Sequence, residues 1–158
     1  SQEKQYLIGF PFDKNVSLEG VFTAPYSLSN TVARDAGTLT VPAFNPANLI
    51  NAPAGATHFR LLVALGCVSD FAFNAQTGTY ESIDVANNEL SDVAYSGYLD
   101  LSAAIATSTV ITATLPGSPT ITADASVLFC IGIEFYQQVG PNYYLFNSGN
   151  ALKVADIF

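Results

Sequence analysis

SVLFCIGIEFY, residues 126–136, is a long apolar run that contains one cysteine and one glutamate. Successive side chains of a β-strand point to opposite faces of a sheet. In this run the odd positions from 127 to 135 carry only Val, Phe and Ile, whereas Cys130, Gly132, Glu134 and Tyr136 share the even positions. The run therefore predicts a central strand over residues 126–139, with one face toward a core and a mixed face opposite.

The chain repeats this composition on both sides of the run. Short segments rich in Val, Ile, Thr, Phe and Tyr alternate with turns that contain Gly, Pro, Asn and Asp, which is typical of strands and turns. A second apolar run, residues 57–68, predicts a strand that is buried on both faces. Further expected strands include residues 5–12, 17–24, 107–115, 142–147 and 151–157.

The turns between these segments indicate how the strands connect. RDAG, residues 34–37, separates two apolar runs and predicts a hairpin in which Gly37 adopts a positive φ. Asn45 can cap a helix and Pro46 suits a first helical position, so we expect one helical turn at residues 46–50. Together the pattern predicts an all-β chain of about nine strands, an antiparallel β-sandwich of Greek-key or jelly-roll type, in a single domain spanning residues 1–158.

The charge balance excludes some classes of partner. The formal net charge is -8, and only 11% of the residues are charged, against about 25% in a typical protein. The five cations are scattered rather than clustered, which argues against a nucleic-acid partner. No apolar segment is long enough to cross a bilayer, so we expect no membrane insertion. So few charges favour an extracellular or cell-surface protein, or one that lies against copies of itself.

The cysteines and the histidine carry little sign of catalysis. Cys67 and Cys130 both lie in apolar runs and form either two core thiols or one buried disulfide. A cysteine nucleophile needs a base, and His58 is the only histidine in the sequence. A single histidine also argues against a zinc site. We therefore expect the chain not to be an enzyme.

The acidic segment 81–100 is a candidate cation site. Asp84, Glu89 and Asp92 offer the oxygen ligands that calcium prefers. Their spacing does not match the EF-hand loop, and a solvated acidic loop would have the same composition. Calcium is thus the one metal that the sequence suggests, and no other cofactor is expected.

Tyrosines give the main candidate binding surface. Tyr95, Tyr98, Tyr136, Tyr143 and Tyr144 fall on or near positions expected to face outward. Exposed tyrosines anchor protein interfaces or stack on sugars, although cross-strand pairing alone also explains them. The sequence predicts a non-catalytic structural or protein-interaction module that can self-assemble through a strand edge or this tyrosine face. The alternative is a carbohydrate-binding module that uses the same tyrosines, assisted by calcium.

Three stretches together carry a resemblance: VPAFNPANLINAPAGATHF (residues 41–59), GIEFYQ (132–137) and NSGNALKV (147–154). They resemble the C-terminal, β-rich part of an uncharacterised family of Bacteroidetes proteins. Members of that family have a more basic, partly helical region before the β-rich part. The resemblance implies that this chain corresponds to the β-rich part and that a region precedes Ser1. It implies no activity and no catalytic residues.

Overall fold

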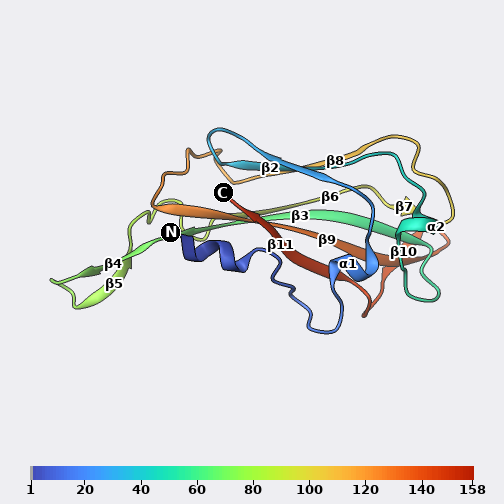
Figure 1. Ribbon diagram of the computed structural model, residues 1–158, viewed down its shortest axis with the longest axis horizontal. Coiled ribbons are helices and arrows are strands. Elements are labelled where there is room, and N and C mark those ends of the chain that lie inside the picture. Colours follow the sequence, from blue (N-terminus) through green and yellow to red (C-terminus); the bar gives the residue numbers. More distant parts are fainter. Residues whose placement is uncertain (1) are drawn as a thin grey trace.

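The computed structural model describes residues 2–158 as an elongated, antiparallel all-β structure with three short helical segments (Figure 1). The helical segments are a 3-10 helix η1 (Gln2–Leu7), α1 (Leu18–Val21) and α2 (Pro46–Leu49). The strands are β1 (Ser27–Asn30), β2 (Ala36–Val41), β3 (His58–Ser69), β4 (Phe71–Asn74), β5 (Thr79–Ser82), β6 (Ser91–Tyr95), β7 (Leu99–Asp100), β8 (Thr109–Thr114), β9 (Ala125–Val139), β10 (Asn142–Leu145) and β11 (Ala151–Ile157). The all-β prediction is confirmed, with more strands than the expected nine.

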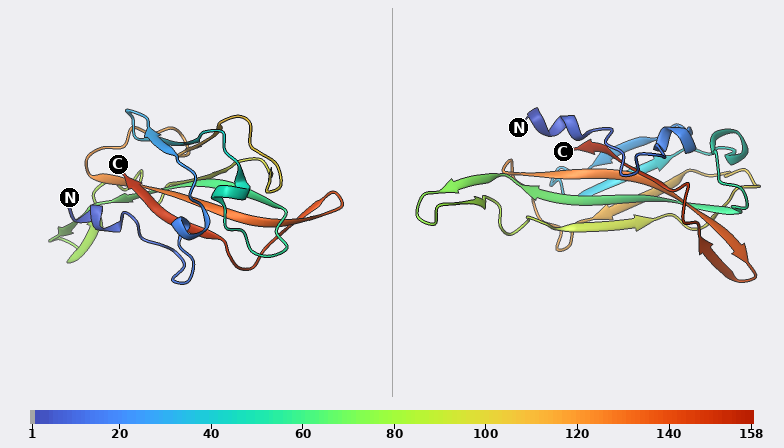
Figure 2. Two further views of the ribbon diagram at one scale, coloured as in Figure 1. Left: turned by 45° about the vertical axis from the view of Figure 1, so that its right-hand side comes forward. Right: turned by 90° about the horizontal axis from the view of Figure 1, so that it is seen from below.

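The strands form three antiparallel sheets. A three-stranded sheet has the order β1–β2–β8, and a six-stranded sheet has the order β10–β9–β3–β6, in which β11 also pairs with β9 and β7 with β3. The third sheet is the hairpin β4–β5, which pairs with nothing else among the described residues. This hairpin, called the arm below, projects from one end of the molecule, and the β9–β10 hairpin extends from the other end (Figure 2).

The core lies between the six-stranded and three-stranded sheets. The odd positions of β9 from 127 to 135, which were predicted to be a core face, are all fully buried, and they pack with the inward side chains of β3. Leu39, Val41, Ile111 and Ala113 close the core from the three-stranded sheet. Since β3 pairs with β9 over its whole length, these two strands form the central ladder of the molecule.

The N-terminal segment differs from its prediction. Residues 5–12 were expected to form a strand, but residues 2–7 form η1, and only the stretch from Gly9 to Phe12 pairs with the edge of β11. Residues 17–24 were also expected to form a strand. Instead Ser17 caps α1 by accepting a hydrogen bond from the Gly20 backbone N–H on its side-chain oxygen. A serine cap offers the backbone a local partner, and here it outweighs the β-propensity of the apolar residues.

The first hairpin is confirmed, but its turn chemistry is not the one expected. Arg34, not Gly37, has the positive φ, of 62°. The Arg34 guanidinium donates to the carbonyls of Thr122 and Ala125, and these bonds hold the turn against the body. Gly37 is required for a different reason, because a Cβ there would lie 2.9 Å from the ring of Phe129.

The remaining turn prediction is confirmed and the disulfide is not formed. α2 begins at Pro46 with Asn45 as its cap, as the sequence indicated. Cys67 and Cys130 are both free and buried. In the β3–β9 register Cys67 lies opposite Val127 and Cys130 lies opposite Ala64, which places the two thiols on opposite faces of the sheet. They are therefore two separate packed thiols.

Candidate functional site

The six-stranded sheet has a second face, directed away from the core and called the outer face below. The even positions of β9 and β3 lie on it, so Glu134 is opposite Arg60 and Gly132 is opposite Leu62. Gly132 is needed here because a Cβ would lie 2.6 Å from the Ala151 carbonyl oxygen and 2.9 Å from a methyl carbon of Leu152. Without that Cβ, Leu62 and Leu152 close over the strand and form an apolar floor.

A shallow groove of about 340 Å³ lies on the outer face. Its floor includes Leu62, Ala64 and Leu152. Val93 and Tyr95 of β6 line one side, while Phe12 and Asp13 of the N-terminal segment line the other. Glu134 also reaches the groove, so a mostly apolar surface carries charged groups at its rim.

An arginine surrounded by tyrosines borders the groove at Tyr95. The guanidinium carbon of Arg60 lies 4.1 Å from the centre of the Tyr95 ring and 5.0 Å from that of Tyr98, which is cation–π geometry. The Arg60 Nε donates to the Ser96 carbonyl oxygen at 3.1 Å. Among the side chains of residues 4–158, Arg60 takes part in neither of the two ion pairs, so no carboxylate of that range pairs with its charge.

Further aromatic contacts extend this cluster across four strands. The rings of Tyr98 and Tyr143 stack in parallel at 3.8 Å between centroids, and Tyr98 meets Tyr136 edge to face at 5.0 Å. His58 contacts Tyr143 edge to face at 5.0 Å. We call Arg60, Tyr95, Tyr98, Tyr136 and Tyr143 the Arg60–tyrosine cluster. Such contacts each stabilise the sheet by about 0.5–1.5 kcal/mol beyond burial.

Tyr136 is the buried member of the cluster. Its hydroxyl donates to Glu134 Oε2 at 2.6 Å. Burial and this carboxylate raise the pKa of Tyr136 to about 12, against the opposing effect of Arg60. The hydroxyl therefore stays protonated at neutral pH and holds Glu134 in place at the rim of the groove.

The structure brings together four of the five tyrosines that the sequence singled out. Tyr144 is the exception, because neighbouring residues of β10 point to opposite faces, and it is 56% exposed away from the cluster. Arg60 was not singled out at all. A lone arginine in the apolar run 58–69 is unusual and could have marked this position as a candidate. Its neighbours, however, depend on the register that β3 makes with β6 and β9, which the sequence does not give.

The three acids suggested for calcium have other surroundings. Asp84 accepts hydrogen bonds from Asn87, and Asp92 accepts one from the Thr114 backbone N–H at 2.9 Å. Glu89 lies on an exposed turn with a φ of 70°. Among the described side chains, those of residues 4–158, no group of three His, Cys, Asp or Glu is placed to hold a metal ion.

Neither thiol is placed as a nucleophile. Burial raises the pKa of Cys67, and it raises the pKa of Cys130 to about 11. Both groups are therefore protonated at neutral pH. His58, the only candidate base, has its Nδ1 3.0 Å from the Thr57 hydroxyl at the far end of β3 from Cys67.

Two findings bear on the wider class of the protein. In the part of the chain that the structure describes, no helix is long and apolar enough to cross a membrane. Comparisons with protein-family models, with curated proteins and with solved structures gave no match. The resemblance drawn from residues 41–59, 132–137 and 147–154 stays a prediction.

Proposed function

We propose that this chain is a non-catalytic protein-interaction module that self-associates, with the outer-face groove as its binding surface. The observation that carries the proposal is the groove itself, an apolar hollow bordered by the Arg60–tyrosine cluster, on the face of the six-stranded sheet that points away from the other sheets of the described residues. Tyrosine and arginine are the residue types that most often dominate binding energy at protein interfaces.

The charges at the groove favour a second copy as the partner. Arg60 borders a groove that Asp13 and Glu134 line, so charges of both signs lie together on a chain whose net charge is -8. Two such chains repel each other over most of their surfaces and repel least where cations offset the acids. A face with charges of both signs can also complement the same chain, as self-association requires.

The arrangement of the rings gives less support to the carbohydrate alternative. A sugar stacks on an open aromatic face. Within the cluster, Tyr143 covers one face of Tyr98, and the Arg60 guanidinium lies over the rings of both Tyr98 and Tyr95. Tyr144 keeps most of its surface open but has none of these neighbours. The cluster therefore suits side-chain contacts at its edges better than stacking on a pyranose.

Light scattering of the purified chain from about 1 µM to about 1 mM tests the proposal over the range in which weak contacts form. We expect the mean mass to rise with concentration. Val93→Lys places an ammonium group in the groove and should weaken association at least about tenfold, because burying that charge is unfavourable.

Val110→Lys is the matched control. Val110 is 61% exposed and Val93 is 49% exposed, both lie on strands, and Val110 belongs to the other sheet. The control should associate like the unmodified chain. A mass of one chain at every concentration, or equal weakening by both substitutions, would refute the groove as a self-association surface.

A further inference from the structure

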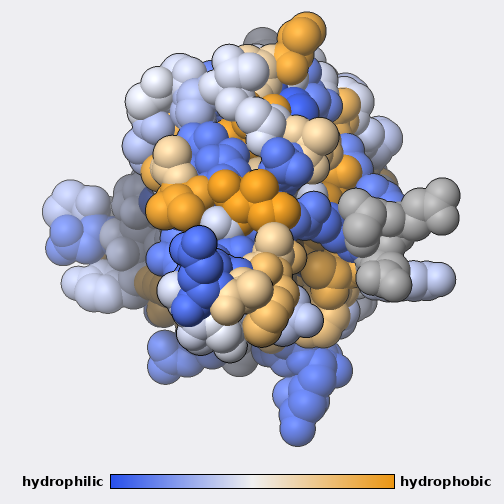
Figure 3. All heavy atoms as spheres, turned by 90° about the vertical axis from the view of Figure 1, so that its left-hand side faces the viewer, coloured by the Kyte–Doolittle hydropathy of each residue, from blue (hydrophilic) through white to orange (hydrophobic). Residues whose placement is uncertain are grey.

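The arm has an aromatic face that is more than half exposed. In the β4–β5 register Phe73 lies opposite Tyr80, and Phe71 shares their face. These three side chains are 55–72% exposed, and the rings of Phe73 and Tyr80 meet edge to face at 5.5 Å. Seen from the end that carries the arm, apolar residues gather near the middle of the surface (Figure 3). An isolated two-stranded hairpin is only marginally stable in water, so this face gains from a partner.

The polar face of the arm keeps the hairpin in register. Glu81 accepts hydrogen bonds from the Asn74 amide at 2.9 Å and from the Thr77 hydroxyl at 2.7 Å. These bonds hold the pKa of Glu81 below its usual range. The aromatic face is therefore displayed by an ordered hairpin rather than by a loose loop.

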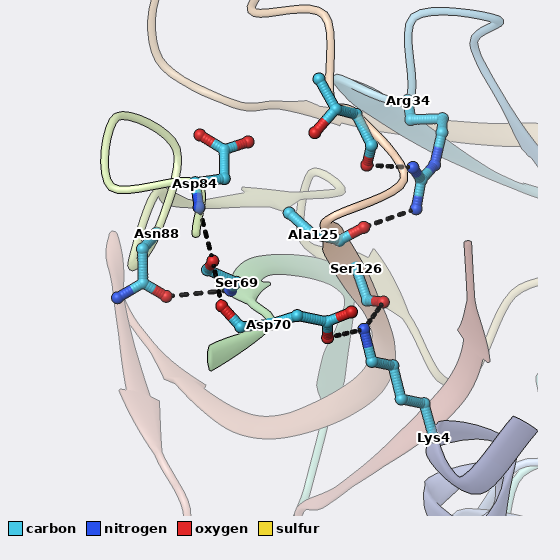
Figure 4. Close-up of polar contacts among 9 residues, drawn as sticks. Lys4, Arg34, Ser69, Asp70, Asp84, Asn88, Ala125 and Ser126 are labelled. Atoms are coloured by element: carbon cyan, nitrogen blue, oxygen red, sulfur yellow. Dashed lines mark hydrogen bonds and ion pairs between the residues drawn. The ribbon is translucent and has the colours of Figure 1, made fainter. Parts of the chain in front are cut away.

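Polar contacts fix the root of the arm to the body (Figure 4). Lys4 of η1 forms an ion pair with Asp70, the residue between β3 and β4, and donates to the Ser126 hydroxyl at 2.7 Å. The Ser69 hydroxyl accepts from the Asp84 backbone N–H at 2.8 Å, and the Ser69 backbone N–H donates to Asn88 Oδ1 at 3.0 Å. The arm is thus held pointing away from the body, so the groove can receive an arm only from another copy.

The charges of the arm complement those beside the groove. The sequence has no lysine or arginine between Arg60 and Lys153, so Glu81, Asp84 and Glu89 make the arm and its base acidic. The groove is itself lined by the acids Asp13 and Glu134, and the cations beside it are Arg60, which contacts Tyr95 of its wall, and Lys14, which follows Asp13 in the sequence. An acidic arm can therefore pair with these two cations at the border of the groove. Opposite charges on two apolar surfaces steer those surfaces together and disfavour other orientations.

We infer that the β4–β5 arm of one copy binds in the outer-face groove of the next, with Phe71, Phe73 and Tyr80 against the floor of Leu62 and Leu152. This inference rests on the proposed function and names the contact that produces it. The arm and the groove are different surfaces, so the contact is heterologous, and repeating it builds either a ring or an open line of copies. The assemblies should therefore grow beyond dimers as the concentration rises.

Complementation between two blocked variants tests the contact. Phe73→Lys blocks the arm and leaves the groove intact, whereas Val93→Lys does the reverse. Each variant alone should stay at the mass of one chain, 16.7 kDa, with association weakened about 30-fold or more. An equimolar mixture should form pairs, since one intact arm and one intact groove remain, and should not grow further. Val110→Lys again serves as the control that keeps the full assembly, and circular dichroism verifies that each variant is folded.

The outcomes separate this inference from the function on which it rests. If Val93→Lys blocks association and Phe73→Lys does not, the groove binds a second copy by another surface and the arm contact is refuted. If both variants stay single and their mixture does not pair, the contact is not arm to groove. If the unmodified chain never associates, the proposed function and this inference both fail.

Discussion

The central ladder and the arm are built from similar sequences and end in opposite environments. β3 passes into β4 with only Asp70 between them, and both strands carry large apolar side chains at alternate positions. In the ladder, Phe59 and Phe135 are completely buried between two sheets. In the arm, Phe71 and Phe73 are more than half exposed. An alternating pattern therefore determines that a strand forms, whereas its burial depends on which other element reaches it.

Truncating one phenylalanine in each region should give the largest contrast. Phe135→Ala removes a buried ring and should lower the free energy of unfolding by about 3–5 kcal/mol. Phe73→Ala should change it by no more than about 0.5 kcal/mol, because its ring is already largely in water. Urea denaturation at a protein concentration too low for association measures both free energies of unfolding. Similar losses from the two substitutions would mean that the arm packs against the body as the ladder does.

Two glycines sharpen the comparison within the ladder itself. Gly132→Ala should destabilise the chain by about 1–3 kcal/mol, since the new Cβ meets the Ala151 carbonyl oxygen and Leu152. Gly66→Ala lies on the same face of the neighbouring strand with nothing within 4 Å of the new Cβ, and it should be neutral or stabilising by up to about 1 kcal/mol. Melting temperatures of the two variants compare them directly. A stable Gly132→Ala variant would show that the floor of the groove can move.

High pH should weaken the tyrosine end of the ladder, because Tyr136 keeps its proton in the folded chain. The pKa of Tyr136 is about 12 in the folded chain and 10 when unperturbed, so between these values the folded state keeps a proton that the unfolded state loses. Its contribution to stability is complete below pH 10 and falls as the pH rises toward 12, by at most about 1.4 kcal/mol per pH unit.

Tyr136→Phe removes this dependence and should flatten the fall in stability between pH 10 and 12. Tyr80→Phe removes a hydroxyl from a side chain that is 72% exposed and does not contact Glu134, so it is the control for the loss of a tyrosine hydroxyl. Denaturant titrations at pH 9 and pH 11 provide the comparison. An unchanged slope for Tyr136→Phe would show that the hydroxyl bonded to Glu134 does not titrate as proposed.

Much of the fold could be predicted because the two apolar runs specify the ladder locally. Residues 57–68 and 126–139 became β3 and β9 almost within their predicted bounds. The N-terminal segments could not be predicted in this way, because strand-like composition in residues 5–12 and 17–24 met no free strand partner along its length. The positive φ of Arg34 was also hidden, because carbonyl acceptors far along the sequence, at Thr122 and Ala125, hold its side chain.

The sequence indicated that tyrosines form the candidate site, but not which residues come together in it. The alternation of odd and even positions along each strand indicated which tyrosines face outward. The stacking of Tyr98 on Tyr143 depends on the β10–β9–β3 order, which no local pattern encodes. Arg60 and the groove were missed for the same reason, because they arise where β6, β9 and the N-terminal segment converge on β3.

The two thiols lie in different layers of the molecule, so their reactivity can report separately on the opening of each layer. Cys67 faces the layer between the two sheets, whereas Cys130 lies under the outer face beside Val154 and Ile157. A thiol-reactive dye therefore reaches each sulfur only when a different layer opens, so the labelling rates distinguish loosening of the sandwich from loosening of the outer face. Because both sulfurs are shielded in the folded chain, oxidation should not link folded copies through a disulfide.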